Sequence, residues 1–419
     1  MTTIFDELES NVRTYCRRFP AVFVKARGHT LWDQEGRSYI DFLSGAGALN
    51  YGHNHPAIKA ALLGYLAADG PVHTMDLHTE AKADLLRRLD GVVLRPRGLA
   101  YRVQFTGPTG ANAIEAALKV ARRATGRTNV IAFTNGFHGM SLGALALAGN
   151  LGKRAASGLP LDGVTRLPYD GYLGEGVDTV DYLERLLDDP GSGIDAPAAI
   201  VLETVQGEGG LAVAGPRWLR RVERTARERG IVLIVDDIQA GCGRTGSFFS
   251  FEESGLRPDI VCLAKSISGY GLPMALTLIR PDLDLQSPGE HSGTFRGHNL
   301  AFVTATAALD LWSSPQFVAD LDKKCLLLAE RVHRLTSLGA AERGRGLLKG
   351  LFFAEESLAT EISLAAFSKG LLLETSGAAN QVVKIMPPLT IDDEALHSGM
   401  DILEDTIQEV VSTRKAAMR

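Results

Sequence analysis

The chain has few of the features that mark metal sites, membrane spans or nucleic-acid binding. Its four cysteines, at positions 16, 242, 262 and 325, show no Cys-x-x-Cys or other metal-ligand spacing, so we expect free thiols in a reducing cytoplasm. No apolar run approaches the roughly 20 residues that a membrane helix needs. The net charge of -5 argues against a nucleic-acid or anionic-membrane partner. The first 18 residues mix charges and lack an apolar core, so we expect no signal peptide.

The chain is long, and it is rich in glycine. Its 419 residues, 45% of them hydrophobic and 22% charged, are enough for a large core and more than one domain. The 45 glycines gather in short loops. Glycine lets a backbone approach a bound molecule closely, so these loops are candidates for a ligand site.

Two apolar runs organise the chemistry. One spans residues 231–235 and ends at Asp236 and Asp237; the other spans 260–264 and ends at Lys265. Continuous apolar runs of this length predict strands buried on both faces, as in a parallel sheet, whose ligands bind beyond the carboxyl ends. A carboxylate and a lysine meeting there suit an aldehyde cofactor on a protonated pyridine. The lysine can hold the aldehyde as a Schiff base, and the aspartate can keep the ring nitrogen charged.

Further strands and glycine-rich loops surround this pair. Strands are expected at 101–105, 130–133 and 199–202, with glycine-rich loops at 106–112, 134–139 and 206–210. The first of these loops opens a helix over 113–123, which suits either a phosphate or an ordinary turn capped by Thr109. The strand expected at 273–279 follows Lys265 too closely for a helical crossover, so it should run antiparallel to its neighbours. Other helices are expected at 56–68, 77–90 and 216–229.

The two ends of the chain predict a smaller unit. Residues 1 to about 40 predict a helical start followed by short strands, and the segment after 316 alternates helices (316–338, 357–369, 392–412) with strands (346–353, 371–374, 382–385). We therefore expect residues 51–315 to form a large cofactor-binding domain, 316–419 a small α+β domain, and 1–50 to pack with the latter. His53 and His55 could ligate a metal, but no third ligand is spaced nearby, so a loop close to a ligand is the preferred reading and no metal site is expected.

The order of these motifs resembles that of a known family. The segments 47–56, 107–110, 133–139, 234–246 and 293–297 are similar to those of class III aminotransferases, and within that family to the diaminobutyrate aminotransferases of the ectoine pathway. The resemblance covers essentially the whole chain. It implies an α/β enzyme of fold type I, with a mostly parallel seven-stranded sheet, a smaller α+β domain and pyridoxal phosphate as cofactor.

The resemblance also assigns roles to residues. Lys265 would be the cofactor lysine and proton shuttle, and Asp236 would pair with the pyridine nitrogen. Strand alternation puts Ile238 on the same side as Asp236, under the ring, and turns Asp237 away. The remaining cofactor contacts would be Gln239 at the ring hydroxyl, Phe137 stacked on the ring with His138 beside it, and Thr109, Gly110 and Ala111 at the phosphate. Thr294 would reach the phosphate of a neighbouring subunit, which implies a homodimer or higher homo-oligomer.

On the substrate side, Glu208 matches a family glutamate that pairs with an arginine. Lys384 stands at that arginine's position and cannot form a planar bidentate fork, although it can still neutralise Glu208. Which residue anchors the 2-oxo acid therefore stays open, with Arg244 and Arg296 as further candidates.

The expected activity moves an amino group between glutamate and aspartate 4-semialdehyde, giving L-2,4-diaminobutyrate and 2-oxoglutarate. The alternatives are another ω-amino substrate of the ornithine or 4-aminobutyrate type, a diaminobutyrate destined for a secondary metabolite, an aminomutase or decarboxylase, and a non-enzymatic cofactor-binding regulator. Lys265 and Asp236 are both present and no basic DNA-binding extension is, which disfavours the regulator.

Overall fold

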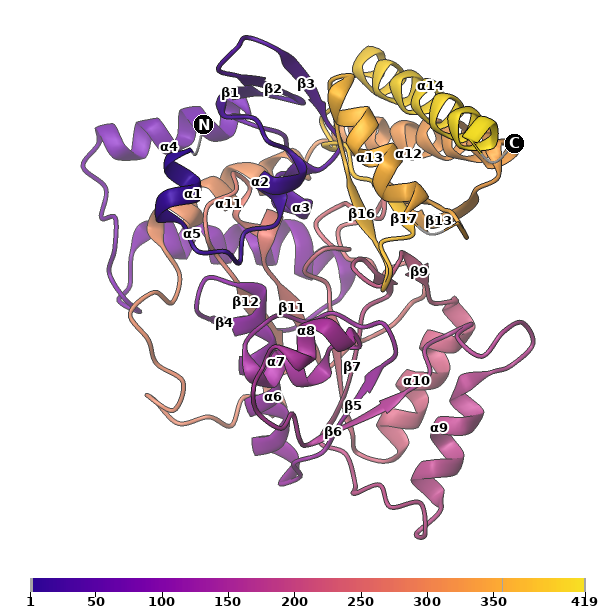
Figure 1. The fold of residues 1–419 in the computed structure, drawn as a ribbon. Helices are drawn as coiled ribbons and strands as arrows, with labels where there is room; N and C mark the ends of the chain where they lie inside the picture. The colour runs from indigo at the N-terminus through magenta and orange to yellow at the C-terminus, as the bar shows by residue number, and fades with distance from the viewer. Residues whose placement is uncertain (1–2, 356, 418–419) are drawn as a thin grey trace.

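A computed structural model describes residues 3–355 and 357–417. Within these residues its central feature is a seven-stranded sheet in the order β4-β12-β11-β10-β7-β5-β6 (Figure 1). The bounds of its strands are β4 Arg102–Phe105, β5 Val130–Phe133, β6 Val164–Leu167, β7 Ala199–Leu202, β10 Val232–Asp236, β11 Ile260–Leu263 and β12 Leu276–Ile279.

This sheet is mostly parallel, as expected. β10 runs parallel to β7 and β11, and β5 runs parallel to β6 and β7. β12 is antiparallel to both of its neighbours, β11 and β4, which confirms the expectation for the strand that follows Lys265. The short connection from β11 to β12 leaves no room for a crossover helix and so requires this direction.

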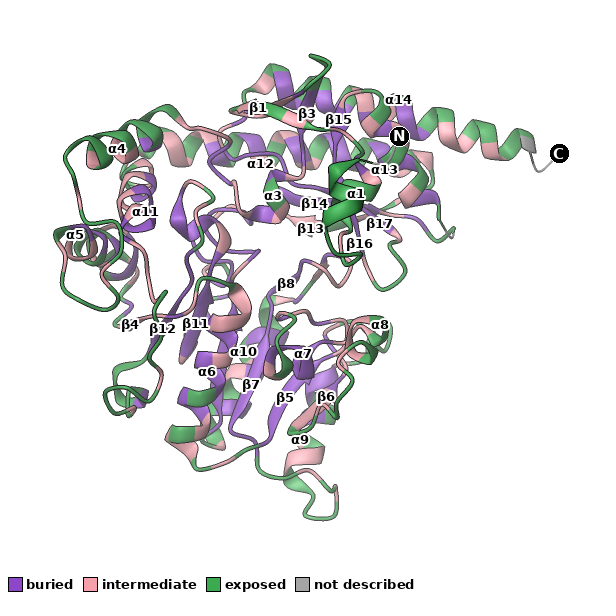
Figure 2. Ribbon diagram, turned by 60° about the vertical axis from the view of Figure 1, so that its left-hand side comes forward, coloured by how far each residue is buried: buried purple, intermediate pink, exposed green. Residues whose placement is uncertain are grey.

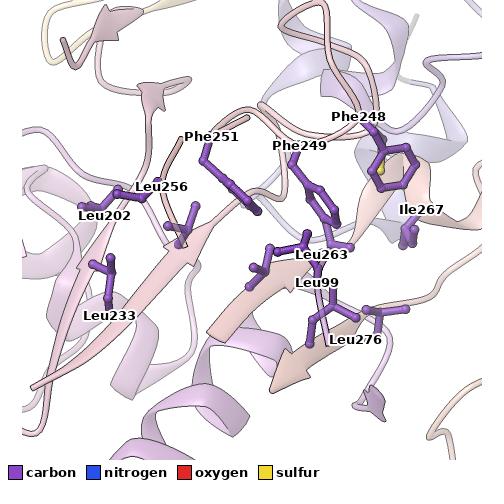
Figure 3. Close-up of a cluster of buried hydrophobic side chains, with 14 of the residues drawn as sticks. Leu99, Leu202, Leu233, Phe248, Phe249, Phe251, Leu256, Leu263, Ile267 and Leu276 are labelled. Carbon is purple, nitrogen blue, oxygen red and sulfur yellow. The ribbon is translucent and has the colours of Figure 1, made fainter. Parts of the chain in front are cut away.

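The inner strands of the sheet are buried on both faces, so they read as nearly continuous apolar runs (Figure 2); these strands are β5, β7, β10, β11 and β12. Alternate residues of β10 enter different cores: Leu233 and Val235 pack on one face, and Val232 and Ile234 on the other. On the first face Phe248, Phe249 and Phe251 lie over leucines of the neighbouring strands (Figure 3). This period of two also fixes which way the residues after β10 point.

Helices cover the two faces. The Leu233 face packs against α5 Glu80–Arg88, α9 Thr179–Asp188, α10 Pro216–Glu228 and α11 Asn299–Leu311. The Ile234 face packs against α6 Gly110–Thr125 and α7 Leu142–Leu147. α4 Pro56–Ala67 lies against α11, and the short α8 Leu151–Ala155 follows α7. α6 ends at Gly126, whose φ of 68° suits the left-handed cap that glycine adopts without strain.

A second group of elements is built from the two ends of the chain (Figure 1). One sheet has the order β13-β14-β17-β16 and another the order β1-β2-β3-β15, so residues near both termini share a sheet. The strands are β1 Phe23–Arg27, β2 Thr30–Asp33, β3 Ser38–Asp41, β13 Ala341–Arg345, β14 Leu348–Phe352, β15 Leu371–Leu372, β16 Glu374–Ser376 and β17 Val382–Ile385. The helices are α1 Ile4–Leu8, α2 Tyr15–Arg18, α3 Ser44–Gly47, α12 Pro315–Leu335, α13 Leu358–Ser368 and α14 Asp393–Ala417; a two-stranded ribbon, β8 Val205–Gln206 with β9 Ala212–Val213, completes the strands.

One expected strand is corrected. The run at 371–374 forms two strands in different sheets. Leu371 and Leu372 pair with β3, and after Leu373 the chain pairs with β17 instead, beginning at Glu374. The division at residues 50/51 and 315/316 remains a proposal. Among the described residues, no helix is long and apolar enough to span a membrane.

Candidate active site

A cavity of about 570 Å³ lies at the carboxyl ends of β10 and β11. It is the size of a typical cofactor site. The strand ends, the first turn of α6 and the loops after β5 and β7 all contribute to it. The residues that line it include Ala48, Thr109, Gly110, Ala111, Asn112, Phe137, His138, Met140, Ser141, Glu203, Glu208, Asp236, Ile238, Gln239, Lys265 and Met274. All the residues expected to bind the cofactor within one chain are therefore brought together.

Asp236 ends β10 on the face that packs against α6, because it continues the alternation of Val232 and Ile234. One oxygen of its carboxylate is 2.7 Å from His138 Nδ1, and the other accepts the backbone N–H of Ile238 at 3.1 Å. Burial works to lower the pKa of His138, but the Asp236 carboxylate raises it overall. A protonated imidazole would stabilise the charge that Asp236 needs in order to pair with a ring nitrogen.

Asp237 points to the opposite face, as the alternation predicts. It is fully buried and accepts the backbone N–H of Ser250 at 3.2 Å. Burial raises its pKa to about 7. It does not line the cavity, so of the two adjacent carboxylates only Asp236 faces it.

Lys265 follows β11 in a left-handed backbone conformation, with a φ of 53°. Such a conformation is unfavourable for a residue with a side chain and persists where neighbouring contacts enforce it. Ser266 supplies those contacts: its hydroxyl donates to the carbonyl of Gly47 at 2.7 Å and accepts the N–H of Asn50 at 3.0 Å. Burial lowers the pKa of the Lys265 ammonium, which favours the neutral, nucleophilic amine.

The first turn of α6 forms an anion cradle. Thr109 caps the helix and accepts the N–H of Asn112, so the N–H groups of Gly110 and Ala111 lie where no intrahelical carbonyl is available. A Cβ at Gly110 would lie 2.8 Å from Ile238 Cδ1, so a side chain there would collide with the floor of the cavity. These features fit the phosphate of pyridoxal phosphate.

Gln239 and Phe137 complete the cradle. Gln239 donates to the carbonyl of Ala46 at 2.9 Å, while its buried Oε1 has no hydrogen-bond partner within residues 3–355 and 357–417. A buried oxygen without a partner is costly, and a ligand hydroxyl would satisfy it. Phe137 borders the cavity with its ring, and the Lys153 ammonium lies 4.1 Å from the ring centroid. The donor set therefore fits pyridoxal phosphate: Lys265 would hold its aldehyde and Asp236 would pair with its ring nitrogen.

Sequence reasoning left Glu203 without a role, although it ends an apolar strand as Asp236 does. Glu203 lines the cavity, and its two oxygens accept the backbone N–H groups of Phe137 and Gly207 at 3.0 and 3.1 Å. It thereby joins the loops after β5 and β7. Burial raises its pKa to about 7. The strand-end carboxylate was the signal that could have identified it.

Glu208 and Lys384, the two residues expected on the substrate side, form an ion pair in which Lys384 is fully buried and Glu208 partly buried. Lys384 Nζ donates to Glu208 Oε1 at 2.8 Å and lies 3.0 Å from the carboxylate of Glu374. Lys384 reaches Glu208 because Val383 and Ile385 enter the core behind β17 and leave Lys384 on the other face. Burial works to raise the pKa of Glu208, but Lys384 lowers it to about 2. The second carboxylate was missed in the sequence, and its other oxygen accepts the hydroxyl of Tyr15 at 2.9 Å.

Other residues singled out in the sequence lie outside this cavity. The fully buried Arg244 binds Asn50 Oδ1 and the carbonyls of Leu347 and Pro387, so it is a structural residue and not the anchor of the 2-oxo acid. Thr294 and Arg296 border a separate cavity. His53 lies 2.8 Å from the Asp41 carboxylate and does not line the main cavity.

Comparison with known proteins agrees with this geometry. Residues 13–407 match the family described as "Aminotransferase class-III". The chain is 53% identical to the diaminobutyrate--2-oxoglutarate transaminase of Halomonas elongata over 98% of this chain and all of that protein, and 51% identical to that of Halalkalibacterium halodurans over 99% and 98%. The ornithine aminotransferase of Toxoplasma gondii superposes with a TM-score of 0.85 at 27% identity, covering 98% of this chain and 94% of that one. The chain therefore belongs to the class-III aminotransferases, whose cofactor is pyridoxal phosphate.

Proposed function

We propose that the protein transfers an amino group between L-glutamate and L-aspartate 4-semialdehyde, giving 2-oxoglutarate and L-2,4-diaminobutyrate. The observation that carries this proposal is the Glu208–Lys384 pair at the cavity, 2.8 Å apart. Glu208 lines the cavity, and the fully buried Lys384 lies directly behind it. The names of the relatives at 51–53% identity and full coverage support the same substrates.

The two half-reactions require different arrangements of Glu208 and Lys384. Glutamate carries a carboxylate on its reacting carbon, whereas diaminobutyrate reacts at a terminal CH₂ that carries none. With the pair closed, the charge of Lys384 is neutralised by Glu208, which suits diaminobutyrate because its reacting carbon carries no carboxylate. If Glu208 turns away, Lys384 offers a point charge to the glutamate carboxylate.

The chain's residues then divide the chemistry. Bound pyridoxal phosphate supplies an acceptor for the amino group and a sink for the electrons released at the substrate carbon. Lys265, its pKa lowered by burial, would take the proton from that carbon and pass it to the cofactor carbon that carried the aldehyde. Asp236, held by His138, keeps the ring nitrogen charged, and Gln239 fixes the ring hydroxyl.

The active protein is a homodimer or larger homo-oligomer in the cytoplasm. Thr294 lies outside its own chain's main cavity, which supports a role at the phosphate of a neighbouring subunit and hence a homodimer or larger homo-oligomer. The four cysteines are free thiols, which fits a cytoplasmic protein. We place the reaction in ectoine biosynthesis, where a later step would consume the diaminobutyrate that this enzyme makes.

The test follows the absorbance of bound pyridoxal phosphate through each half-reaction. L-2,4-diaminobutyrate should bleach the visible band, 2-oxoglutarate should restore it, and mass spectrometry should find glutamate. Lys265→Ala, which keeps the cavity but lacks the amine, should show neither change. Bleaching by ornithine or 4-aminobutyrate but not by diaminobutyrate would keep the aminotransferase and refute the substrate.

A further inference from the structure

A smaller cavity of about 180 Å³ adjoins the cofactor site and shares two lining residues with it, Phe137 and Glu208. Its other walls are mostly polar and come from the loop after β5, from α8 and from β16. They include Asn135, Asn150, Lys153, Thr375, Ser376 and Asn380. The hydroxyls of Ser376 and Thr375 already donate to Gly207 and Asn380, so the groups suited to a carboxylate are the side-chain amides and the ammonium.

Lys153 is the cation of this smaller cavity. It lies half-buried on α8, and its ammonium is held over the ring of Phe137, 4.1 Å from the centroid. In the described part of the chain its side chain has no ion-pair partner. Lys384, by contrast, is fully buried between Glu208 at 2.8 Å and Glu374 at 3.0 Å. Three lysines lie near Glu208: Lys384, Lys265 and Lys153. Lys384 is held by two carboxylates and Lys265 is expected to hold the cofactor, so Lys153 is the one whose charge is available to a ligand.

The two substrates share one chemical feature at a fixed distance. In glutamate the side-chain carboxylate carbon lies three bonds from the reacting carbon. In diaminobutyrate, which reacts at its terminal amine, the α-carboxylate carbon also lies three bonds from the reacting carbon. A single cation beyond Phe137 could therefore serve both half-reactions, whereas the carboxylate on the reacting carbon belongs to glutamate alone.

We propose that Lys153 binds the carboxylate three bonds from the reacting carbon in both substrates, with the polar walls of the smaller cavity around it. For diaminobutyrate this rests on the proposed function; for glutamate it rests only on the family's reaction. Phe137 holds the ammonium in place through its ring, so the stem of Lys153 is ordered before the substrate arrives.

The test compares Lys153→Met, which keeps an unbranched stem against Phe137 but removes the charge, with Lys153→Arg, which keeps the charge. The bleaching of bound pyridoxal phosphate is followed with two matched pairs of donors: glutamate and L-2-aminobutyrate, and diaminobutyrate and 1,3-diaminopropane. Within each pair the second molecule lacks only the distal carboxylate group. If the truncated donors react too slowly in the wild type, the inhibition constants of glutarate and butyrate replace them.

Lys153→Met should raise the apparent dissociation constants of glutamate and diaminobutyrate by roughly 10- to 100-fold, the range expected for a lost hydrogen bond to a charged group. L-2-Aminobutyrate and 1,3-diaminopropane should change less than about twofold, and Lys153→Arg should recover most of the loss. An equal loss for all four donors would show that Lys153 only supports Phe137, and no loss would also overturn the proposal. If wild-type protein ignores diaminobutyrate, the proposed function fails while Lys153 is still judged on glutamate and L-2-aminobutyrate.

Discussion

The buried Lys384 cluster allows a stability prediction with a worked magnitude. Lys384→Met removes the ammonium from between Glu208 and Glu374 and leaves Glu374, whose side chain is 3% exposed, with only the Tyr15 hydroxyl close by. Breaking a buried pair from one side typically costs about 3–5 kcal/mol. An unfolding entropy of about 2.1 cal/mol/K per residue over 419 residues is ~0.9 kcal/mol/K, so the melting temperature should fall by about 3–6 °C.

The pH dependence separates an uncompensated charge from lost packing. A buried carboxylate that has lost its cation is costly only while it carries its charge. The melting difference measured by calorimetry should therefore be larger at pH 8 than at pH 5. Adding Glu374→Gln to Lys384→Met should recover part of the loss at pH 8. Lys323→Met, which breaks an exposed pair with Asp393, is the control and should shift the melting temperature by less than about 1 °C. The reasoning is refuted if Lys384→Met lowers the melting temperature by no more than Lys323→Met does, or by the same amount at pH 5 and pH 8.

Two further predictions concern the carboxyl edge of the sheet. Gly110→Ala places a Cβ 2.8 Å from Ile238 Cδ1, so it should weaken the binding of pyridoxal phosphate to the apoprotein roughly tenfold in a fluorescence titration. The control is Gly64→Ala, in a helix with open space around it, which should leave the affinity unchanged. Equal affinities of the two variants would contradict a tightly fitting phosphate site. In the wild type, burial raises the pKa of the Asp237 carboxyl to about 7, so the folded protein binds this proton more tightly than the unfolded chain does. The wild type therefore loses stability as the pH rises from about 4 through 7, and Asp237→Asn removes this loss. The melting temperature of the variant relative to wild type should accordingly climb between pH 5 and pH 8, and a difference that does not vary with pH would count against this assignment.

The sequence predicted the elements whose signal is local. β10 and β11 could be placed because both faces of the sheet are buried and the strands are apolar throughout. The side on which Asp236 lies followed from the period of two. The α6 cap at Thr109 and the end of the helix at Gly126 followed from their residue types.

The elements that the sequence did not predict lie at sheet edges or depend on distant partners. β6 and β13 are edge strands whose half-exposed polar residues break the apolar pattern. Glu374 ends an apolar run, yet only the register of β16 with β17 sets it opposite Lys384. Lys153 lies in a stretch with no motif, and its contact with Phe137 depends on how α8 packs. Such pairings arise from tertiary structure and leave no mark in a single sequence.

The parallel pairing of β3 with β15 has a consequence for synthesis. Ile40 and Leu371 are register partners, so 331 residues separate them along the chain. At about 5–20 residues per second, the edge of β3 stays without its neighbour for roughly 17–66 s after it leaves the ribosome. An open strand edge is a template for pairing with other chains. The nascent protein is therefore most exposed to aggregation in its first 50 residues, and a chaperone that covers this edge should raise the yield of folded enzyme.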